Sequence, residues 1–359
     1  MRRINILTTH QLKSKLYLFP LHLHARKLRE ADISFKLFYR IRSELFDADQ
    51  IVIDQHFSSQ LWKDRQEDRH KFLGEAKEKS QRLLWFDTTA STSIQQPDVL
   101  PYVTGYYKAL VLRDLSLYSR PLYSNRVFSD YYHRKFSITD EEPAASPYLK
   151  SAQDLDKIKL FWNYSLAGFA GIQTRIYNRL RTFLPFPYFY SLNFTPPQTA
   201  RPTDISCRLA VAYERNTISH QRRKLKHLLE EKYKLDVSRI SQREYLRELR
   251  RAKISLSPFG WGEINYRDFE IIPSGSALMK PDMEHLRTWP FLYRKDETYI
   301  SHDWDLSNVE EKIDYYLQNN RYAEVAHRSQ SLYRTYLFSK EGHEEFLKRV
   351  MSIFNSNED

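Results

Sequence analysis

The sequence predicts an α/β protein built from two Rossmann-like domains, each with a parallel sheet covered by helices. Short apolar runs alternate with helix-prone charged stretches in both halves of the chain, which is typical of parallel sheets. The 359 residues suit two domains of this kind, and a proline-rich segment at 194–202 separates the halves. Hydrophobic residues make up 41% of the chain, which is enough for packed cores and argues against global disorder.

Charge and cysteine content limit the class of protein. The formal net charge of +11 suits nucleic acid, an anionic membrane surface or anionic small substrates, but also a basic soluble protein without such partners. Cys207 is the only cysteine, so the chain forms no internal disulfide and no cysteine metal cluster, which favours a reducing, cytoplasmic setting. The apolar run in residues 1–9 is too short for a signal peptide, and no window approaches the ~18 apolar residues of a membrane span.

In the first half we expect strands at residues 4–7, 49–54 and 82–87, with helices between them. The glycine-rich turn of a dinucleotide-binding domain is absent after the first strand, which argues against an NAD-type domain. Asp54, His56 and Asp87 lie at or just past predicted strand ends, where α/β domains place their chemistry. Each aspartate could equally cap a helix or form a turn.

Two aromatic tracts follow. Residues 95–136 interleave tyrosines with Arg and Lys, which predicts either a surface that stacks bases or sugar rings or, as we favour, an aromatic surface between the domains. Residues 160–192 combine aromatic and apolar side chains with Arg175, Arg179 and Arg181. This second tract fits a helix lying on an anionic membrane surface, and it fits equally a helix buried between the domains.

Beyond the proline-rich linker at 194–204, we expect a strand at 206–213 and a long basic helix that begins at Glu214 and runs to Lys232. Cations at the start of a helix oppose its dipole, so a bound anion would explain them, as would a solvated basic face. Ser241 begins an amphipathic helix with the Ser-x-x-Glu pattern of a capping box. The last helices are predicted at 309–317, 321–336 and 342–354.

The central stretch of the second half reads as one βαβ unit: a strand at 254–256, a glycine turn, a helix at 263–272 and a strand at 277–279. Gly260 and Gly262 allow backbone to approach a ligand closely. Glu263, Arg267 and Glu270 are spaced to share one helix face. A carboxylate there suits ribose hydroxyls and an arginine suits a diphosphate, although a solvated helix could carry the same ladder.

This stretch resembles the donor-binding half of GT-B glycosyltransferases, most closely the group-1 bacterial enzymes and their CgeB-like relatives. The resemblance covers about residues 205–335 and implies two Rossmann-like domains that face a cleft. In retaining members a Glu-x7-Glu element ends in the glutamate that holds the nucleotide ribose. Glu270, followed by Gly275, matches that glutamate, whereas Glu263 lies one residue closer than the usual first glutamate.

The resemblance implies a metal-independent glycosyltransferase that moves a sugar, with retention of configuration, from a UDP- or GDP-linked donor to a glycan or lipid-linked acceptor. It implies a role in bacterial surface polysaccharide or glycoconjugate synthesis. It requires no cofactor and no nucleic acid. We expect Asp87 and Glu263 at the reacting sugar and acceptor, and donor contacts from Arg215, Arg222, Ser257, Gly260, Gly262, Arg267 and Glu270. The Asp303-Trp-Asp305 string is expected to cap a helix rather than bind metal.

The predicted organisation is an acceptor-side domain at 1–193, a linker at 194–204, a donor domain at 205–340 and a terminal helix at 341–359 that crosses back to the first domain. We expect a cytoplasmic protein, peripheral at the inner face of the membrane if the 160–190 tract binds anionic lipid. Two alternatives stay open: a basic nucleic-acid-binding protein, which the charge suits, and a GT-B relative that binds nucleotide sugars without catalysis.

Overall fold

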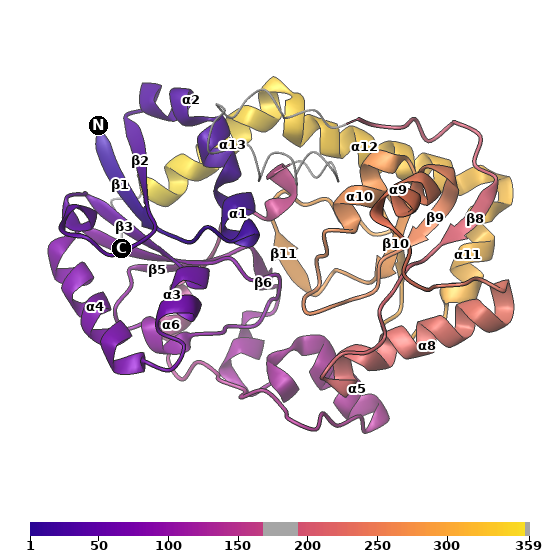
Figure 1. The fold of residues 1–359 in the computed structure, drawn as a ribbon, viewed down its shortest axis with the longest axis horizontal. Coiled ribbons are helices and arrows are strands. Elements are labelled where there is room, and N and C mark those ends of the chain that lie inside the picture. The colour runs from indigo at the N-terminus through magenta and orange to yellow at the C-terminus, as the bar shows by residue number, and fades with distance from the viewer. Residues whose placement is uncertain (168–192, 356–359) are drawn as a thin grey trace.

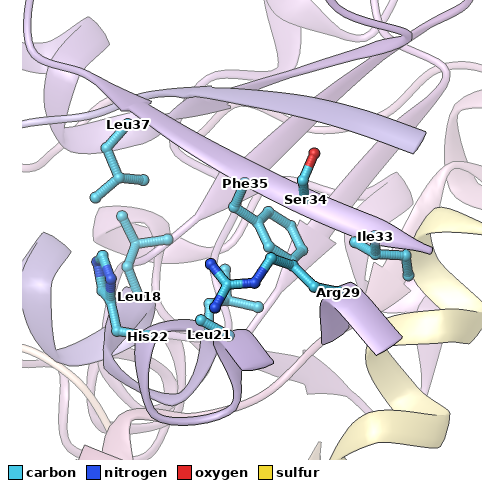
Figure 2. A pocket seen from close by; sticks show the side chains of 9 residues that line it. Leu18, Leu21, His22, Arg29, Ile33, Ser34, Phe35 and Leu37 are labelled. Atoms are coloured by element: carbon cyan, nitrogen blue, oxygen red, sulfur yellow. The ribbon is translucent and has the colours of Figure 1, made fainter. Parts of the chain in front are cut away.

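The computed structural model describes residues 1–167 and 193–355, and they form two parallel sheets (Figure 1). Every neighbouring pair of strands within these two sheets is parallel, which confirms the predicted α/β fold with two Rossmann-like domains. The first sheet has the order β2-β1-β3-β4-β5-β7 and the second has the order β12-β10-β9-β8. The strands are β1 (Arg2–Leu7), β2 (Ile33–Phe38), β3 (Gln50–Asp54), β4 (Arg82–Asp87), β5 (Gly105–Lys108), β7 (Ile158–Leu160), β8 (Thr203–Ser206), β9 (Ala252–Leu256), β10 (Ala277–Pro281) and β12 (Ile300–His302).

Helices accompany both sheets, and the apolar residues that they bury form three cores. One core lies wholly in the first domain and one wholly in the second, whereas the third combines buried residues of both. A shared apolar core favours a fixed arrangement of the domains over free relative motion. The helices are α1 (Leu12–Leu23), α2 (Ala25–Glu30), α3 (Gln55–Leu61), α4 (Gln66–Lys79), α5 (Val127–Phe136), α6 (Ala152–Asp156), α8 (Asn216–Tyr233), α9 (Gln242–Arg251), α10 (Asp268–Ser274), α11 (Val309–Leu317), α12 (Arg321–Phe338) and α13 (Lys340–Phe354).

Two segments from the second half of the chain reach the first domain. Helix α13 lies along the first domain (Figure 1), where the carbonyl of Phe354 accepts a hydrogen bond from Gln50 at 2.8 Å and that of Ile353 accepts one from Arg82 at 2.8 Å. Strand β11 (Leu286–Thr288) pairs in antiparallel fashion with β6 (Leu110–Leu112). The two domains are therefore joined by backbone pairing as well as by apolar packing.

The predicted linker packs on the second domain. The backbone N–H of Thr195 donates to the carbonyl of Pro273 at 2.8 Å. Arg201 is 5% exposed and donates to the carbonyls of Ala252 at 2.9 Å and Ser274 at 2.8 Å. These bonds hold the segment before β8 against the amino end of β9 and the end of α10.

Two predicted elements differ from the structure. Strand β8 ends at Ser206, and the chain continues as a loop to Arg215 instead of a strand to residue 213. Helix α10 spans Asp268–Ser274 rather than 263–272, and its C-cap, Gly275, has the positive φ of 78° that glycine tolerates.

The tract at 160–192 is described only up to residue 167, so the membrane-surface prediction for it lies outside the described residues beyond that point. The described part contains β7 and a buried 3₁₀ turn, Tyr164–Ala167. None of the described helices combines the length and the apolar character that crossing a membrane requires.

Candidate functional site

A pocket of about 410 Å³ lies at the carboxyl ends of β8 and β9. Ligands of parallel α/β sheets bind at this edge, and the volume falls within the range of small-molecule sites. Its walls come from the loops after the two strands, from the second turn of α8, from the first turns of α9 and α10, and from residues just before α9. They comprise Arg208, Leu209, Ala210, Tyr213, Arg222, Arg239, Ile240, Gln242, Tyr245, Asn265, Tyr266, Arg267 and Glu270.

Two arginines of this pocket carry charge that no carboxylate of the described residues pairs within 4.0 Å. Arg222 is 5% exposed and is held by hydrogen bonds to the carbonyls of Phe259 at 2.7 Å and Ala210 at 3.1 Å. Burial, with Arg267 nearby, lowers the pKa of Arg222 to about 10. The Nη1 atom of Arg267 is buried and makes no hydrogen bond within the described residues. Buried guanidinium groups without a counter-ion are the groups that an anionic ligand would satisfy.

The opposite charge in the pocket belongs to Glu270, in the first turn of α10. Its Oε1 atom accepts a hydrogen bond from Gln242 at 2.8 Å. Gln242 is the first residue of α9, whose start is fixed by the predicted capping box between Ser241 and Glu244. A rigid helix start therefore holds the carboxylate in place.

The Tyr245 hydroxyl is a second unsatisfied group in the same pocket. This side chain is 8% exposed, its oxygen makes no hydrogen bond within the described residues, and burial raises its pKa. A buried polar atom without a partner costs folding free energy of about 1–3 kcal/mol. Together with the Nη1 atom of Arg267, the pocket thus contains two buried polar atoms that a ligand could pair.

Arg222, Arg267 and Glu270, predicted from the sequence, therefore line one pocket, and all of its walls belong to the second domain. At the nearby contact between the domains the two backbones touch directly: a Cβ atom placed on Gly262 would lie 1.7 Å from the carbonyl oxygen of Ala90. The pocket is therefore a hollow within the second domain, beside the contact between the two domains.

The turn residues support the site without lining the pocket. Ser257 is 1% exposed and donates to Asp268 at 2.5 Å, so it fixes the loop instead of contacting a ligand. A Cβ atom on Gly260 would lie 3.0 Å from Asn265 Oδ1 and 3.5 Å from Arg222 Nη2, both on pocket residues. Gly262 serves close packing of the domains. The predicted approach of glycine backbone to a ligand is therefore wrong for Gly262.

Glu263 is not on the helix face predicted for it. It precedes α10, has no exposed surface, and accepts hydrogen bonds from the Thr92 N–H at 3.2 Å and the Thr92 hydroxyl at 2.6 Å. Burial alone would raise its pKa, but the His285 ring, 3.7 Å away, and the hydrogen bonds from Thr92 outweigh burial and lower it. Glu263 therefore connects the second domain to the first, and it does not reach the pocket with Arg267 and Glu270.

Asp87 is also enclosed by protein rather than turned toward a ligand. Its side chain has no exposed surface and pairs with Lys108 at 2.5 Å. It also accepts hydrogen bonds from the Tyr106 hydroxyl at 3.1 Å and from the N–H and hydroxyl of Thr89 at 3.0 and 2.6 Å. The prediction that Asp87 faces the acceptor is not supported, because its oxygens are used within the first domain.

Arg215 stands at the start of α8 and does not line the pocket. The anion expected at the start of this basic helix is a side chain of the first domain, because Asp140 accepts a hydrogen bond from the Thr217 N–H at 2.8 Å. The guanidinium of Arg215 lies 5.5 Å from the ring centroid of Trp261. Arg215 and Arg222 were both expected to contact the donor, but only Arg222 lines the pocket.

The aspartates of the Asp303-Trp-Asp305 string stabilise local structure. Asp305 pairs with Lys135 at 2.5 Å and accepts a hydrogen bond from the Ser307 N–H at 3.0 Å. Burial would raise its pKa, but the Lys135 and Ser307 hydrogen bonds lower it instead. Within the described residues no three His, Cys, Asp or Glu side chains are grouped as metal ligands.

Only part of the tyrosine-rich tract lies between the domains, because Tyr106 and Tyr118 are buried in the core of the first domain. On α5 the Tyr132 hydroxyl donates to the carbonyl of Trp304 at 2.9 Å, and the ring of Tyr131 contacts that of Trp304 at 5.3 Å between centroids. Gln242 and Tyr245 were not predicted as pocket residues. The one usable signal was the capping box at Ser241, which places both on one face of the first turn of α9.

No family model matches the chain, and no curated protein matches it. Among solved structures, Anabaena HepE in complex with UDP and glucose is 8% identical, with a TM-score of 0.45, over 99% of this chain and 100% of that one. Sucrose-phosphate synthase from Thermosynechococcus elongatus is 10% identical, with a TM-score of 0.45, over 99% and 100%. An alpha-glucosyltransferase in complex with UDP and a DNA 13-mer is 11% identical, with a TM-score of 0.43, over 98% and 99%.

Proposed function

We propose that this protein is a glycosyltransferase that takes its sugar from a nucleotide-sugar donor bound in the pocket of the second domain. One observation carries the proposal: Arg267 Nη1 and the Tyr245 hydroxyl are buried and unpaired in a pocket that also holds Arg222 and Glu270. A nucleoside diphosphate offers anionic oxygens to the guanidinium groups and ribose hydroxyls to the carboxylate.

The charges also suit the chemistry of transfer. The bond between the anomeric carbon and the diphosphate breaks, an acceptor hydroxyl forms the new bond to that carbon, and the released nucleoside diphosphate takes up the proton. Negative charge builds up on the diphosphate as its bond breaks. Arg222, held in place by its hydrogen bonds to backbone carbonyls, and Arg267 beside it stabilise that charge. In this proposal they take the part that a divalent metal has in other transferases.

The finer assignments belong to the same proposal. The donor carries UDP or GDP, the acceptor is a glycan or a lipid-linked saccharide, and the product belongs to bacterial surface polysaccharide or glycoconjugate synthesis. We place the reaction in the reducing cytoplasm, which suits a chain whose single cysteine, Cys207, is free and buried.

The test measures thermal stabilisation and calorimetric affinity with UDP, GDP and their sugar conjugates, because a ligand that binds only the folded state raises Tm. One donor should stabilise the wild-type protein. Arg267→Gln should weaken its binding roughly 10- to 100-fold, since hydrogen bonds to charged groups contribute about 1.5–3 kcal/mol. Glu270→Gln should weaken nucleoside diphosphates but not pyrophosphate, because the carboxylate is assigned to the ribose.

Arg247→Gln is the matched control, because Arg247 is an exposed arginine on α9 outside the pocket lining. Its affinity for the donor should equal that of the wild-type protein. If Arg267→Gln binds the donor as tightly as Arg247→Gln does, the assignment of the pocket is wrong. If no nucleotide stabilises the wild-type protein, the proposed function itself is wrong.

A further inference from the structure

Beside the pocket, Trp261 is contacted by two arginines that come from different domains. Its side chain is 45% exposed, although it stands in the tight turn that brings Gly262 against Ala90. The guanidinium carbons of Arg126 and Arg215 lie 5.4 and 5.5 Å from its ring centroid. Arg126 directly precedes α5 in the first domain, and Arg215 directly precedes α8 in the second.

The two guanidinium groups are held close together by neutral groups. Both donate to the same carbonyl, that of Ser124, at 3.3 Å from Arg126 and 3.4 Å from Arg215. Arg126 also donates to the carbonyl of Trp261 at 2.9 Å. Burial and the charge of Arg215 lower the pKa of Arg126 to about 10. Two like charges oriented by carbonyls form a preorganised site for an anion.

No carboxylate of the described residues compensates this pair within 4.0 Å. Two acidic residues act on Arg126 from further away, Glu263 and Asp140, and Glu263 is bonded to Thr92. The oxygens of Asp140 accept hydrogen bonds from the Thr217 N–H at 2.8 Å, from the Thr217 hydroxyl at 3.0 Å and from the hydroxyl of Ser124. Asp140 therefore caps α8 instead of neutralising the arginines. An anionic ligand would supply the missing charge.

The exposure of Trp261 distinguishes this cluster from ordinary packing between domains. Its exposed ring surface stays open to a ligand such as a sugar ring. Tyr213 contacts the Trp261 ring at 5.7 Å between centroids and also lines the pocket. The cluster thus adjoins the proposed donor pocket at the junction of the two domains.

We propose that Trp261, Arg126 and Arg215 form an acceptor subsite for an anionic saccharide. The phosphate or carboxylate of the acceptor binds the two guanidinium groups, and its sugar ring packs on the exposed part of the indole. This inference rests on the proposed transfer function and adds to it the class of acceptor. A neutral glycan would leave the paired charges of Arg126 and Arg215 unmatched.

The experiment titrates the full-length protein, by calorimetry, with a hexose 6-phosphate, the free hexose and a hexuronate. The wild-type protein should bind the phosphate at least tenfold more tightly than the free hexose. Arg215→Gln should remove that preference, and Trp261→Ala should weaken binding of the phosphate severalfold. Arg223→Gln should match the wild-type protein, because Arg223 is an exposed arginine on α8 away from the cluster. Circular dichroism checks that each variant is folded.

Equal binding of phosphate and free hexose, or an unchanged preference in Arg215→Gln, overturns the subsite. A hexuronate that binds as tightly as the phosphate supports recognition of the negative charge. Binding of UDP and GDP to the wild-type protein is measured in parallel. If a nucleotide binds but the phosphate preference is absent, only the acceptor class fails, whereas the absence of nucleotide binding defeats the proposed transfer function.

Discussion

Single residues at the contact between the domains have little freedom to change. Gly262 faces the backbone of Ala90, and the next residue, Glu263, is bonded to Thr92. Both contacts connect the turn after β9 to the loop after β4. This turn also positions Arg222 through the carbonyl of Phe259. The geometry of the pocket in the second domain therefore depends on packing against the first.

The first prediction concerns Gly262→Ala. A Cβ atom there would lie 1.7 Å from the carbonyl oxygen of Ala90, so backbone must shift. We expect the free energy of unfolding, measured by urea denaturation, to fall by about 1–3 kcal/mol, as in overpacked cores. The control is Gly74→Ala in α4, where no atom lies within 4 Å, and it should raise stability by about 0.5–1 kcal/mol. Similar changes in the two variants would contradict the packing role.

The sequence indicated that the glycines after β9 have a structural or functional role, but it did not show which role. Gly260 and Gly262 were assigned to ligand approach because they follow a strand and are scarce in the chain. What a missing Cβ atom makes room for depends on residues distant in sequence, here Ala90 and Arg222, and no local pattern reports it. Asp87 was misplaced for the same reason, because its partner Lys108 lies on the adjacent strand β5.

At the scale of elements, apolar runs and capping patterns predicted strands and helices correctly, whereas a helix start without a side-chain cap was misplaced. The apolar runs of β1, β3, β4, β9 and β10 and the capping box of α9 are confirmed. The start of α10 was placed too early because Arg267, at its N-cap, makes no side-chain cap. Asp268, its first residue, instead accepts hydrogen bonds from Ser257, Lys280 and Tyr293. Such a buried network forms across several elements, so helical periodicity does not reveal it.

The second prediction concerns the start of α8, which Asp140 caps from the other domain. Asp140→Ala removes the acceptor of the Thr217 N–H and hydroxyl in a buried setting. Losing a cap costs about 0.5–2 kcal/mol, and leaving buried donors unpaired adds to that loss. We expect the free energy of unfolding to fall by about 2 kcal/mol. Thermal denaturation should show a lower Tm for Asp140→Ala.

Glu141→Ala is the control for that prediction, because Glu141 is exposed in the same loop. Its change in stability should stay within about 0.5 kcal/mol. If the two variants have the same Tm, the first domain does not stabilise α8, and the separation of Arg215 from the pocket would need another cause.

At the scale of the whole molecule, the sequence predicted two sheets but not how they are joined. The core shared by both domains combines residues of α1, α10, α12 and α13 that look, in sequence, like separate amphipathic helices. Strands β6 and β11 are three residues each, too short for a periodic signal, although their pairing connects the domains. Which apolar faces meet is decided by packing, and composition alone does not encode it.

The last prediction is the pH dependence of stability. His24, after α1 in the first domain, is 7% exposed and packs on His343 and Phe346 of α13, with ring centroids at 4.8 and 4.9 Å. Burial, then the charges of His343 and Lys27, lower the pKa of His24 to about 4. The unfolded chain therefore binds this proton more readily than the folded chain. The contribution of His24 to the free energy of unfolding is fully present above pH 6.5, and it is lost as the pH drops from 6.5 towards 4.

The pKa of His24 also sets the size of the expected loss of stability. The lowered pKa of His24 corresponds to a loss of about 3 kcal/mol of folding free energy between pH 6.5 and 4, and His302, whose pKa burial also lowers to about 4, adds to the slope. His24→Phe keeps a ring against α13 but takes up no proton, so its urea-unfolding free energy should vary less between pH 6.5 and 4. His227→Gln, at an exposed histidine of α8, should keep the wild-type slope. If the unfolding free energy of His24→Phe depends on pH as strongly as that of the wild-type protein, protonation of His24 does not cause the loss of stability in acid.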